Sequence, residues 1–352
     1  MVRLAEVIRK SNKKKISKKS EHVRVGNAGT LKSLAGEREK ATTDKKRVTT
    51  GITVSPEKLY EGLVNFMTGV VDRVKKRERF DIQKGSKIIN VIVSYPKGIL
   101  DDLHRLTLLS AGNKEASLAT HAANVSINAI IMGAGFGYPR AKQIELGTAA
   151  LFHDIGMYRV PDTIINKKGR LTPSEMKVIR KHPEVAYNEL LKYGEEYRWL
   201  AEIGYQEHER VDGSGYPRGL KDDQIHEYAS IIGILDIYDA LIHNRPQRGG
   251  LSPAYAMKEI VRSSKGLFPP SIIKHLLNQL SIFPVKSYVK LNNDSIGMVV
   301  KTNSLWPLKP VLSLIYDAQG KRVRDGRVLD LAENPLLYIK DIIREEDMPD
   351  FS

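Results

Sequence analysis

The chain has 352 residues, of which 41% are hydrophobic and 28% are charged, a balance typical of a soluble globular protein with one sizeable core. It has no cysteine, which excludes disulfides, cysteine-type zinc fingers and iron–sulfur clusters, so any metal must be held by nitrogen and oxygen atoms. No run approaches the roughly 20 apolar residues of a membrane span, and no signal peptide follows the basic N-terminal residues. We therefore expect a cytoplasmic protein with no transmembrane segment.

The net charge of +15 is concentrated at the N-terminus. Residues 1–50 contain 15 Lys and Arg against 5 Asp and Glu, so they carry +10 of the +15. A charge block with so few apolar residues is typical of a solvated, flexible tail. Contact with an anionic lipid, a nucleic acid or an acidic partner is the alternative, although no aromatic residue lies among these lysines to stack on bases.

Residues 51–112 are predicted to form an N-terminal helical region. Ser55 offers a hydroxyl for an N-cap, and Pro56 and Glu57 suit the first helical turn. Apolar residues then recur at helical spacing before a charged stretch at residues 75–79, namely Leu59, Leu63, Phe66, Val70, Val71 and Val74. A second helix is expected over residues 87–110, with an interruption near Pro96.

Residues 113–283 keep a helical pattern, with alanine-rich and Ile/Leu-rich segments between turns and no alternation of period two. Gly133, Gly135 and Gly137 resemble a dinucleotide-binding loop at first sight. They follow a helical segment and precede Pro139, whereas that loop requires a strand before it. We therefore interpret the three glycines as a helix end and a turn.

After Pro284 the pattern changes to short apolar runs separated by polar turns. Residues 288–291 and 296–300 flank a turn and predict two strands, and residues 311–316 predict a third. Residues 284–352 are therefore expected to be a small β-rich C-terminal segment. The fold class predicted for the chain is mainly α, with this small β appendage.

The adjacent residues His153 and Asp154 are the most informative pair in the chain. An imidazole next to a carboxylate is typical of metal sites, although alone it proves little. Further candidate ligands occur on both sides at intervals of 26 to 32 residues, namely His121, His182, His208 and Asp236. We expect each of these candidates to lie on a helix of its own.

Each candidate has a simpler alternative when taken singly. A lone histidine such as His121 or His182 is more often a core or surface residue than a ligand. Asp236 lies in the almost wholly apolar run 231–242, where a carboxylate needs a partner or a metal unless it is a helix N-cap. Taken together, imidazoles and carboxylates without thiols suit iron, manganese, cobalt, nickel or zinc. A bridging Asp154 and two ions ~3.5–4 Å apart would suit phosphoryl chemistry, which predicts a hydrolase.

A longer series of motifs carries a resemblance to a known family. In chain order the motifs are His153-Asp154-Ile155-Gly156, Pro161-Asp162, Leu171-Thr172-Pro173, Lys181-His182, HERVDGSGYPRGL at 208–220, DIYDAL at 236–241, and Arg245-Pro246-Gln247-Arg248. Together they resemble the HD-GYP family of cyclic di-GMP phosphodiesterases over nearly half of the chain.

The resemblance implies an HD-superfamily helical bundle with a centre of two or three metal ions, iron or alternatively manganese. Such a centre hydrolyses cyclic di-GMP to pGpG or GMP. The residues that match metal-ligand positions are His121, His153, Asp154, His182, Glu207, His208 and Asp236. The residues that match positions near the substrate are Gly215, Tyr216, Pro217, Arg245 and Arg248, and of these Tyr216, Arg245 and Arg248 join Asp154 as the expected catalytic set.

Three positions depart from the family pattern. Met157 replaces the lysine of the HDIGK motif, Glu207 replaces the first histidine of a His-His pair, and Ser117 replaces a glutamate found in trinuclear members. The serine favours two metal ions over three. Two divalent ions carry +4, and the carboxylates of Asp154, Glu207 and Asp236 would supply −3. Loss of a preorganised cation costs about 2.7–4 kcal/mol of transition-state stabilisation, so we expect weak activity.

Three functions follow from these observations. The first is a dinuclear cyclic di-GMP phosphodiesterase, in which Tyr216 contacts either the substrate or a diguanylate cyclase (GGDEF) domain. The second is a catalytically weak adaptor that binds metal or nucleotide. Met157 and Glu207, which depart from the family pattern, are the residues that favour this alternative. The third is a phosphohydrolase acting on another nucleotide, which the joint presence of the GYP loop and the Arg-Pro-x-Arg run disfavours.

Overall fold

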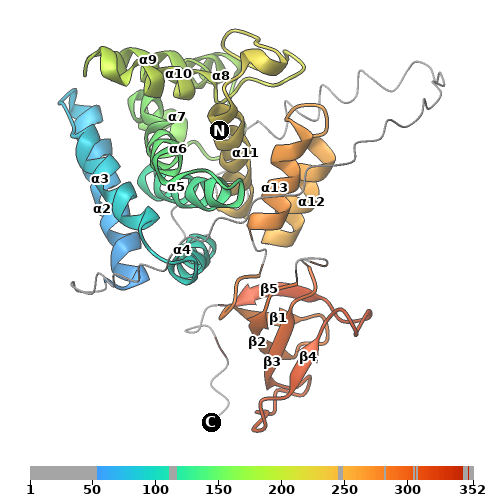
Figure 1. Cartoon of the computed structure of the whole chain (residues 1–352). Helices are drawn as coiled ribbons and strands as arrows, with labels where there is room; N and C mark the ends of the chain where they lie inside the picture. Colours follow the sequence, from blue (N-terminus) through green and yellow to red (C-terminus); the bar gives the residue numbers. More distant parts are fainter. Residues whose placement is uncertain are drawn as a thin grey trace, which may run out of the picture.

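The computed structural model describes residues 54–110, 117–244, 249–280, 283–303, 306, 308–343 and 348. The predicted basic tail 1–50 and the two predicted substrate arginines, Arg245 and Arg248, lie outside these residues. Among the described helices, none has the length and apolar character needed to cross a membrane. The fold is mainly helical, with a small sheet at the C-terminal end (Figure 1), as predicted.

The N-terminal helices are α2 (Pro56–Lys76), α3 (Ile82–Val93) and α4 (Lys97–Ser110). The cap predicted at Ser55 is confirmed, because its side chain accepts a hydrogen bond from the Lys58 amide. The apolar stripe of α2 is buried along most of its length. The second predicted helix is divided at Pro96, and its first part begins at Ile82, five residues earlier than predicted.

The central part of the chain consists of helices joined by short turns. In order they are α5 (Leu118–Gly135), α6 (Arg140–Phe152), η1 (Ile155–Arg159), α7 (Asp162–Ile165), α8 (Pro173–Ile179), α9 (His182–Leu191), η2 (Glu195–Tyr197), α10 (Arg198–Gln206), η3 (Asp222–Gln224), α11 (Glu227–Ile242), α12 (Pro253–Ser263) and α13 (Pro270–Gln279). The end of α5 confirms the interpretation of the three glycines, since Gly137 follows it with a φ of 72°.

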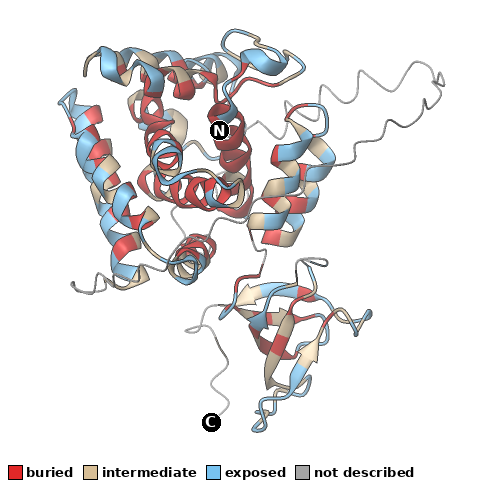
Figure 2. Cartoon of the chain, in the orientation of Figure 1, coloured by how far each residue is buried: buried red, intermediate tan, exposed pale blue. Residues whose placement is uncertain are grey.

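Helices α5 and α11 form the centre of the bundle. Both are apolar on nearly all sides and almost wholly buried, as Figure 2 shows. Helix α5 packs against α2, α4, α6, α11 and α13, so two of the N-terminal helices, α2 and α4, contact the same helix that contacts α11. Polar residues on α5 and α11 are therefore held inside the bundle.

The C-terminal residues form one antiparallel sheet in the order β4-β3-β2-β1-β5. The strands are β1 (Tyr288–Leu291), β2 (Ile296–Lys301), β3 (Val311–Tyr316), β4 (Val328–Asp330) and β5 (Ile339–Ile343). The three predicted strands are confirmed. The other two were not predicted, because β4 has only three residues and β5 places two charged residues between its apolar ones. Lys286, just before the sheet, pairs with Asp102 of α4 at 3.2 Å.

Candidate metal centre

The seven predicted metal ligands lie together at the middle of the helical bundle, and each is at most 5% exposed. His121 lies in α5 and Asp236 lies in the middle of α11, which rules out the N-cap alternative for Asp236. The prediction also holds for His182, the first residue of α9, but it is wrong for the remaining candidates. His153 and Asp154 lie between α6 and η1, His182 begins α9, and Glu207 and His208 follow α10. The candidate ligands at the ends of α6, α9 and α10 thus lie close together where the chain turns between helices.

The candidate ligand atoms form two groups. Atoms of His121, His153 and Asp154 lie within 4.8 Å of one another, and so do atoms of His182, Glu207 and His208. Two acids connect the groups: Glu207 Oε2 is 3.5 Å from His153 Nε2, and Asp154 Oδ1 is 3.3 Å from His182 Nε2. The seventh candidate joins the first group, since Asp236 Oδ1 is 3.3 Å from His121 Nε2.

Hydrogen bonds fix the orientation of two of the imidazoles. His153 Nδ1 donates to the Ala150 carbonyl at 2.7 Å, and His182 Nδ1 donates to the Ile179 carbonyl at 2.8 Å. Burial lowers the pKa of His153 to about 4 and the pKa of His182 to about 3. Both rings are therefore neutral at pH 7, and each points the lone pair of its Nε2 into the centre. This is the tautomer that a metal ion requires.

The carboxylates at the centre repel one another when no cation is present. Burial raises the pKa of Glu207 well above its usual range, and the charges of Asp154 and Asp236 raise it further. Burial alone would lower the pKa of His121, but the carboxylates of Asp236 and Asp239 on either side of its ring raise it to about 9. A divalent ion would displace that proton and offset the three negative charges.

Several buried polar atoms at the centre lack a hydrogen-bond partner within the described residues. They are His121 Nε2, His153 Nε2, Glu207 Oε2 and Asp236 Oδ1. Buried polar atoms are normally paired, because removing them from water without a partner is unfavourable. Nitrogen and oxygen atoms that all face one space fit a divalent cation. The residues present therefore fit the metal that the sequence predicts.

Asp239 supports the candidate ligand His121 from outside the centre. Its Oδ2 accepts a hydrogen bond from His121 Nδ1 at 2.6 Å, which leaves His121 Nε2 facing Asp236. A carboxylate behind a histidine ligand typically fixes the ring and raises its basicity. The sequence analysis quoted Asp239 without giving it a role. Asp239 follows Asp236 by three residues, so both lie on one face of the helix, and this spacing could have indicated a role at the same site.

Two glycines allow backbone segments that carry candidate ligands to approach closely. A Cβ on Gly156, the glycine of the His-Asp-Ile-Gly motif, would collide with the carbonyl oxygen of His182. A Cβ on Gly233 would collide with the carbonyl oxygen of Glu207. These two contacts bring η1 against α9 and α11 against the end of α10.

The loop 212–220 folds back on the residues that follow α10. The buried carboxylate of Glu209 accepts hydrogen bonds from the Arg218 amide at 2.7 Å and the Leu220 amide at 3.0 Å. Buried Arg210 donates to the carbonyls of Glu207 and Glu209 at 3.0 and 2.6 Å. The sequence analysis assigned neither residue, because their partners are backbone groups that only the tertiary fold supplies.

Tyr216 lies beside the metal centre at the tip of this loop. Its ring stacks on His208 with centroids 4.7 Å apart, and the guanidinium of Arg180 lies 4.8 Å from the ring centroid. The neighbouring Gly215 packs against the backbone of Glu209, and the Tyr216–Pro217 peptide bond is cis. Of the residues predicted near the substrate, Gly215, Tyr216 and Pro217 are thus grouped next to a candidate ligand.

The three departures from the family pattern have distinct surroundings. Met157 is buried within η1, and Ser117 caps α5 by accepting a hydrogen bond from the Thr120 amide at 3.0 Å. The third, Glu207, belongs to one of the two groups of candidate ligands. Ser117 therefore serves as the N-cap of α5.

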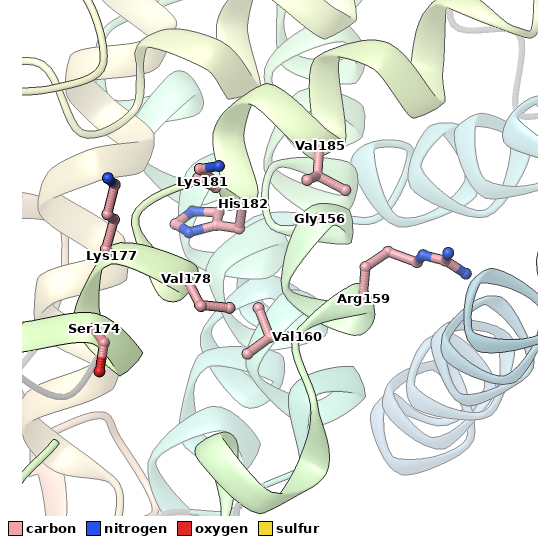
Figure 3. Close-up of a pocket in the computed structure, with 9 residues that line it drawn as sticks. All are labelled: Gly156, Arg159, Val160, Ser174, Lys177, Val178, Lys181, His182 and Val185. Atoms are coloured by element: carbon pink, nitrogen blue, oxygen red, sulfur yellow. The ribbon is translucent and has the colours of Figure 1, made fainter. Parts of the chain in front are cut away.

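A pocket of about 440 Å³ lies between η1, α8 and α9. His182 forms part of its wall (Figure 3), together with Lys177 and Lys181. The apolar part of the wall consists of Val160, Val178 and Val185. The pocket thus combines positive charge with an apolar surface beside one candidate metal ligand, and its volume lies in the range of small-molecule sites.

Comparisons with known proteins agree with the residue pattern. The HD domain family matches residues 109–272, and the family described as a KOW domain associated with HD domain matches residues 288–351. A cyclic di-GMP phosphodiesterase of Pseudomonas aeruginosa is 33% identical over 187 residues, which are 53% of this chain and 45% of that protein. A 3′3′-cGAMP-specific phosphodiesterase of Vibrio cholerae is 30% identical over 202 residues, 56% of this chain and 43% of that one.

A solved structure supports the fold. An HDG"Y"P protein from Bdellovibrio bacteriovorus superposes with a TM-score of 0.52 and 19% identity, covering 65% of this chain and 73% of that one. The present chain spans less than half the length of the two phosphodiesterases that it matches. Its motifs, its buried ligand groups and these matches lead to one conclusion: residues 109–272 form an HD domain that carries the HD-GYP motif pattern, and residues 288–351 match a KOW domain associated with HD domains.

Proposed function

We propose that the chain is a metal-dependent phosphodiesterase that hydrolyses cyclic di-GMP to pGpG, GMP or both. The observation that carries this proposal is the pair of buried ligand groups connected by Glu207 and Asp154. The relatives named above, which act on cyclic dinucleotides, support the substrate class. The proposed cofactor is two divalent ions, iron or alternatively manganese, because the donor set is nitrogen and oxygen without sulfur.

In the proposed mechanism the protein orients the reacting groups. Bound divalent ions would lower the pKa of a water and draw charge from the phosphodiester. His153 and His182 present neutral Nε2 atoms because their Nδ1 protons are donated to carbonyls. Asp239 holds the ring of His121 through its Nδ1. Each ring is therefore fixed before substrate arrives, which lowers the reorganisation needed during the reaction.

We assign substrate contact to the groups beside the centre. Tyr216 is proposed to border the substrate together with Gly215 and Pro217, and Arg245 and Arg248 to pair with phosphate oxygens. Lys177 and Lys181 supply positive charge in the pocket beside His182, which supports anion binding even though position 157 is a methionine. Under this proposal the absence of a cation at position 157, which is Met157, lowers the rate without abolishing it.

The proposed setting of the protein is the cytoplasm, where cyclic di-GMP is its substrate. The exposed residues Asp212, Ser214 and Arg218 of the GYP loop are proposed to contact a GGDEF domain, and the basic tail 1–50 an anionic partner.

One assay tests the proposed function. Protein reconstituted anaerobically with iron or manganese is incubated with cyclic di-GMP or 3′3′-cGAMP, and the products are separated by chromatography. We expect turnover of cyclic di-GMP, and loss of turnover in Asp236→Asn. The matched control is Asp223→Asn, which neutralises an exposed carboxylate in η3. Metal binding without turnover of either nucleotide would contradict the proposal and favour the adaptor function, and turnover of 3′3′-cGAMP alone would replace the substrate.

A further inference from the structure

A chain of hydrogen bonds runs from the N-terminal helical region to the candidate ligand His121. The hydroxyl of Tyr60, in α2, donates to Asn124 Oδ1 at 2.8 Å. Asn124 Nδ2 donates to Asp239 Oδ1 at 3.0 Å. The other oxygen of Asp239 accepts from His121 Nδ1 at 2.6 Å. Three contacts thus connect α2 to the ring that faces Asp236.

A second branch connects the same asparagine to the end of α11. Asn124 Nδ2 lies 3.1 Å from Ser110 Oγ, the last residue of α4, and 3.1 Å from His243 Nε2. His243 Nδ1 donates to the Asp239 carbonyl at 2.8 Å. Because His243 is the C-cap of α11, this branch fixes the C-terminal end of that helix, two residues before Arg245 in the sequence.

The network lies almost wholly inside the protein. Asn124 is 0% exposed, Asp239 1% and His243 2%, so water does not replace a lost contact easily. Burial raises the pKa of Tyr60 to about 12, and its hydroxyl therefore keeps its proton and acts as a donor. Inside a protein, a hydrogen-bonded chain of this kind is rigid when each member is satisfied and costly when one partner is removed.

Tyr60 lies outside the part of the chain that the HD domain family matches, which begins at residue 109. The HD domain therefore receives one member of this network from another region of the chain. Helix α2 also packs directly against α5, which carries both Asn124 and His121. A displacement of α2 would move the tyrosine away from the asparagine that orients Asp239.

We propose that Tyr60 is a positioning residue for the metal centre, acting through Asn124 and Asp239 on the ring of His121. The N-terminal helical region is thereby part of the site and not merely a neighbour of it. This inference rests on the proposed function to the extent that it takes His121 to be a metal ligand. It goes further in giving α2 a means of changing metal affinity from outside the HD domain.

The test compares two tyrosines of the same helical region. Tyr60→Phe removes the hydroxyl at the start of the network, and Tyr95→Phe removes one for which no hydrogen bond is described. The dissociation constant for Mn²⁺ is measured by competition with a chelator, and the melting temperature of the metal-free protein is measured beside it. We expect Tyr60→Phe to weaken Mn²⁺ binding about tenfold, the lower end of outer-shell effects, and Tyr95→Phe to leave it unchanged.

A double variant separates positioning from general destabilisation. If Tyr60 acts through Asn124, then adding Tyr60→Phe to Asn124→Ala changes Mn²⁺ affinity little further. Wild-type Mn²⁺ affinity in Tyr60→Phe would overturn the inference, and so would fully additive losses. A wild-type protein that binds no Mn²⁺ or iron would instead overturn the proposed function, so the two failures are distinguishable.

Discussion

Asp154 and Glu207 are the residues on which the candidate metal centre most depends, because each belongs to one ligand group and contacts a histidine of the other. The pattern His153-Asp154, taken together with the spaced residues His121, His182, His208 and Asp236, located this centre in the sequence. Asp239 could also have been predicted from its spacing to Asp236. Glu209 and Arg210 could not, because a pattern in one chain does not show which backbone amides and carbonyls will face a buried charge.

Asp154→Ala is expected to lose metal. The change removes a carboxylate from the first group and its contact with His182, so affinity should fall by more than the 10–100-fold that is typical of outer-shell changes. Metal content after gel filtration, measured by elemental analysis, checks this. Asp223→Asn should keep the wild-type content. Full metal occupancy in Asp154→Ala would mean that the His-Asp pair is structural.

Met157→Lys is expected to raise the turnover of cyclic di-GMP. A preorganised cation near the developing charge contributes about 10²–10³-fold in rate, and the new lysine would restore one from η1. The measurement is kcat at saturating substrate with metal content held equal. Met157→Leu conserves volume and should leave kcat unchanged. Unchanged kcat in Met157→Lys would show that Lys177, Lys181 or another group already supplies the charge.

At the scale of elements, the sequence predicted local starts and stops well. The N-cap at Ser55 and the break at Pro96 follow from the chemistry of a few neighbouring residues, and both were found. The ligand-bearing helix ends around His153 and Glu207 were not predicted, because those ends are set by packing between distant helices. The short strands β4 and β5 were missed for a similar reason, since pairing with β3 and β1 defines them.

Gly233→Ala is expected to destabilise the junction of α11 with the end of α10. Its Cβ would collide with the Glu207 carbonyl, and overpacking of this kind costs about 1–3 kcal/mol. Thermal unfolding and metal content check the prediction, and both should fall. The control is Gly62→Ala at an exposed position of α2, where nothing lies within 4 Å of a new Cβ and a gain in stability of about 0.4–1 kcal/mol is expected. A melting temperature for Gly233→Ala at or above wild type would contradict the packing argument.

At the scale of the whole molecule, three regions have different relations to the centre. The HD domain supplies all seven candidate ligands, between His121 and Asp236. The N-terminal helices reach the centre through Tyr60, whereas Lys286, just before the KOW match, pairs with Asp102 of α4. The division into regions at residues 50, 112 and 283 stays a prediction. The sequence pattern predicted the change from helix to strand near Pro284. It did not predict the contact of α2 with the centre, because that contact depends on tertiary structure.

The metal content of the wild-type protein tests the central claim most directly. Seven buried candidate ligands that offer nitrogen or oxygen atoms in two connected groups, with Ser117 serving as a helix cap, predict two ions per chain. The measurement is elemental analysis of protein reconstituted anaerobically with iron or manganese and then freed of unbound metal. We expect about two ions per chain. A value near three would require a ligand outside the seven, and a value near zero would contradict the metal centre and the hydrolytic function that depends on it.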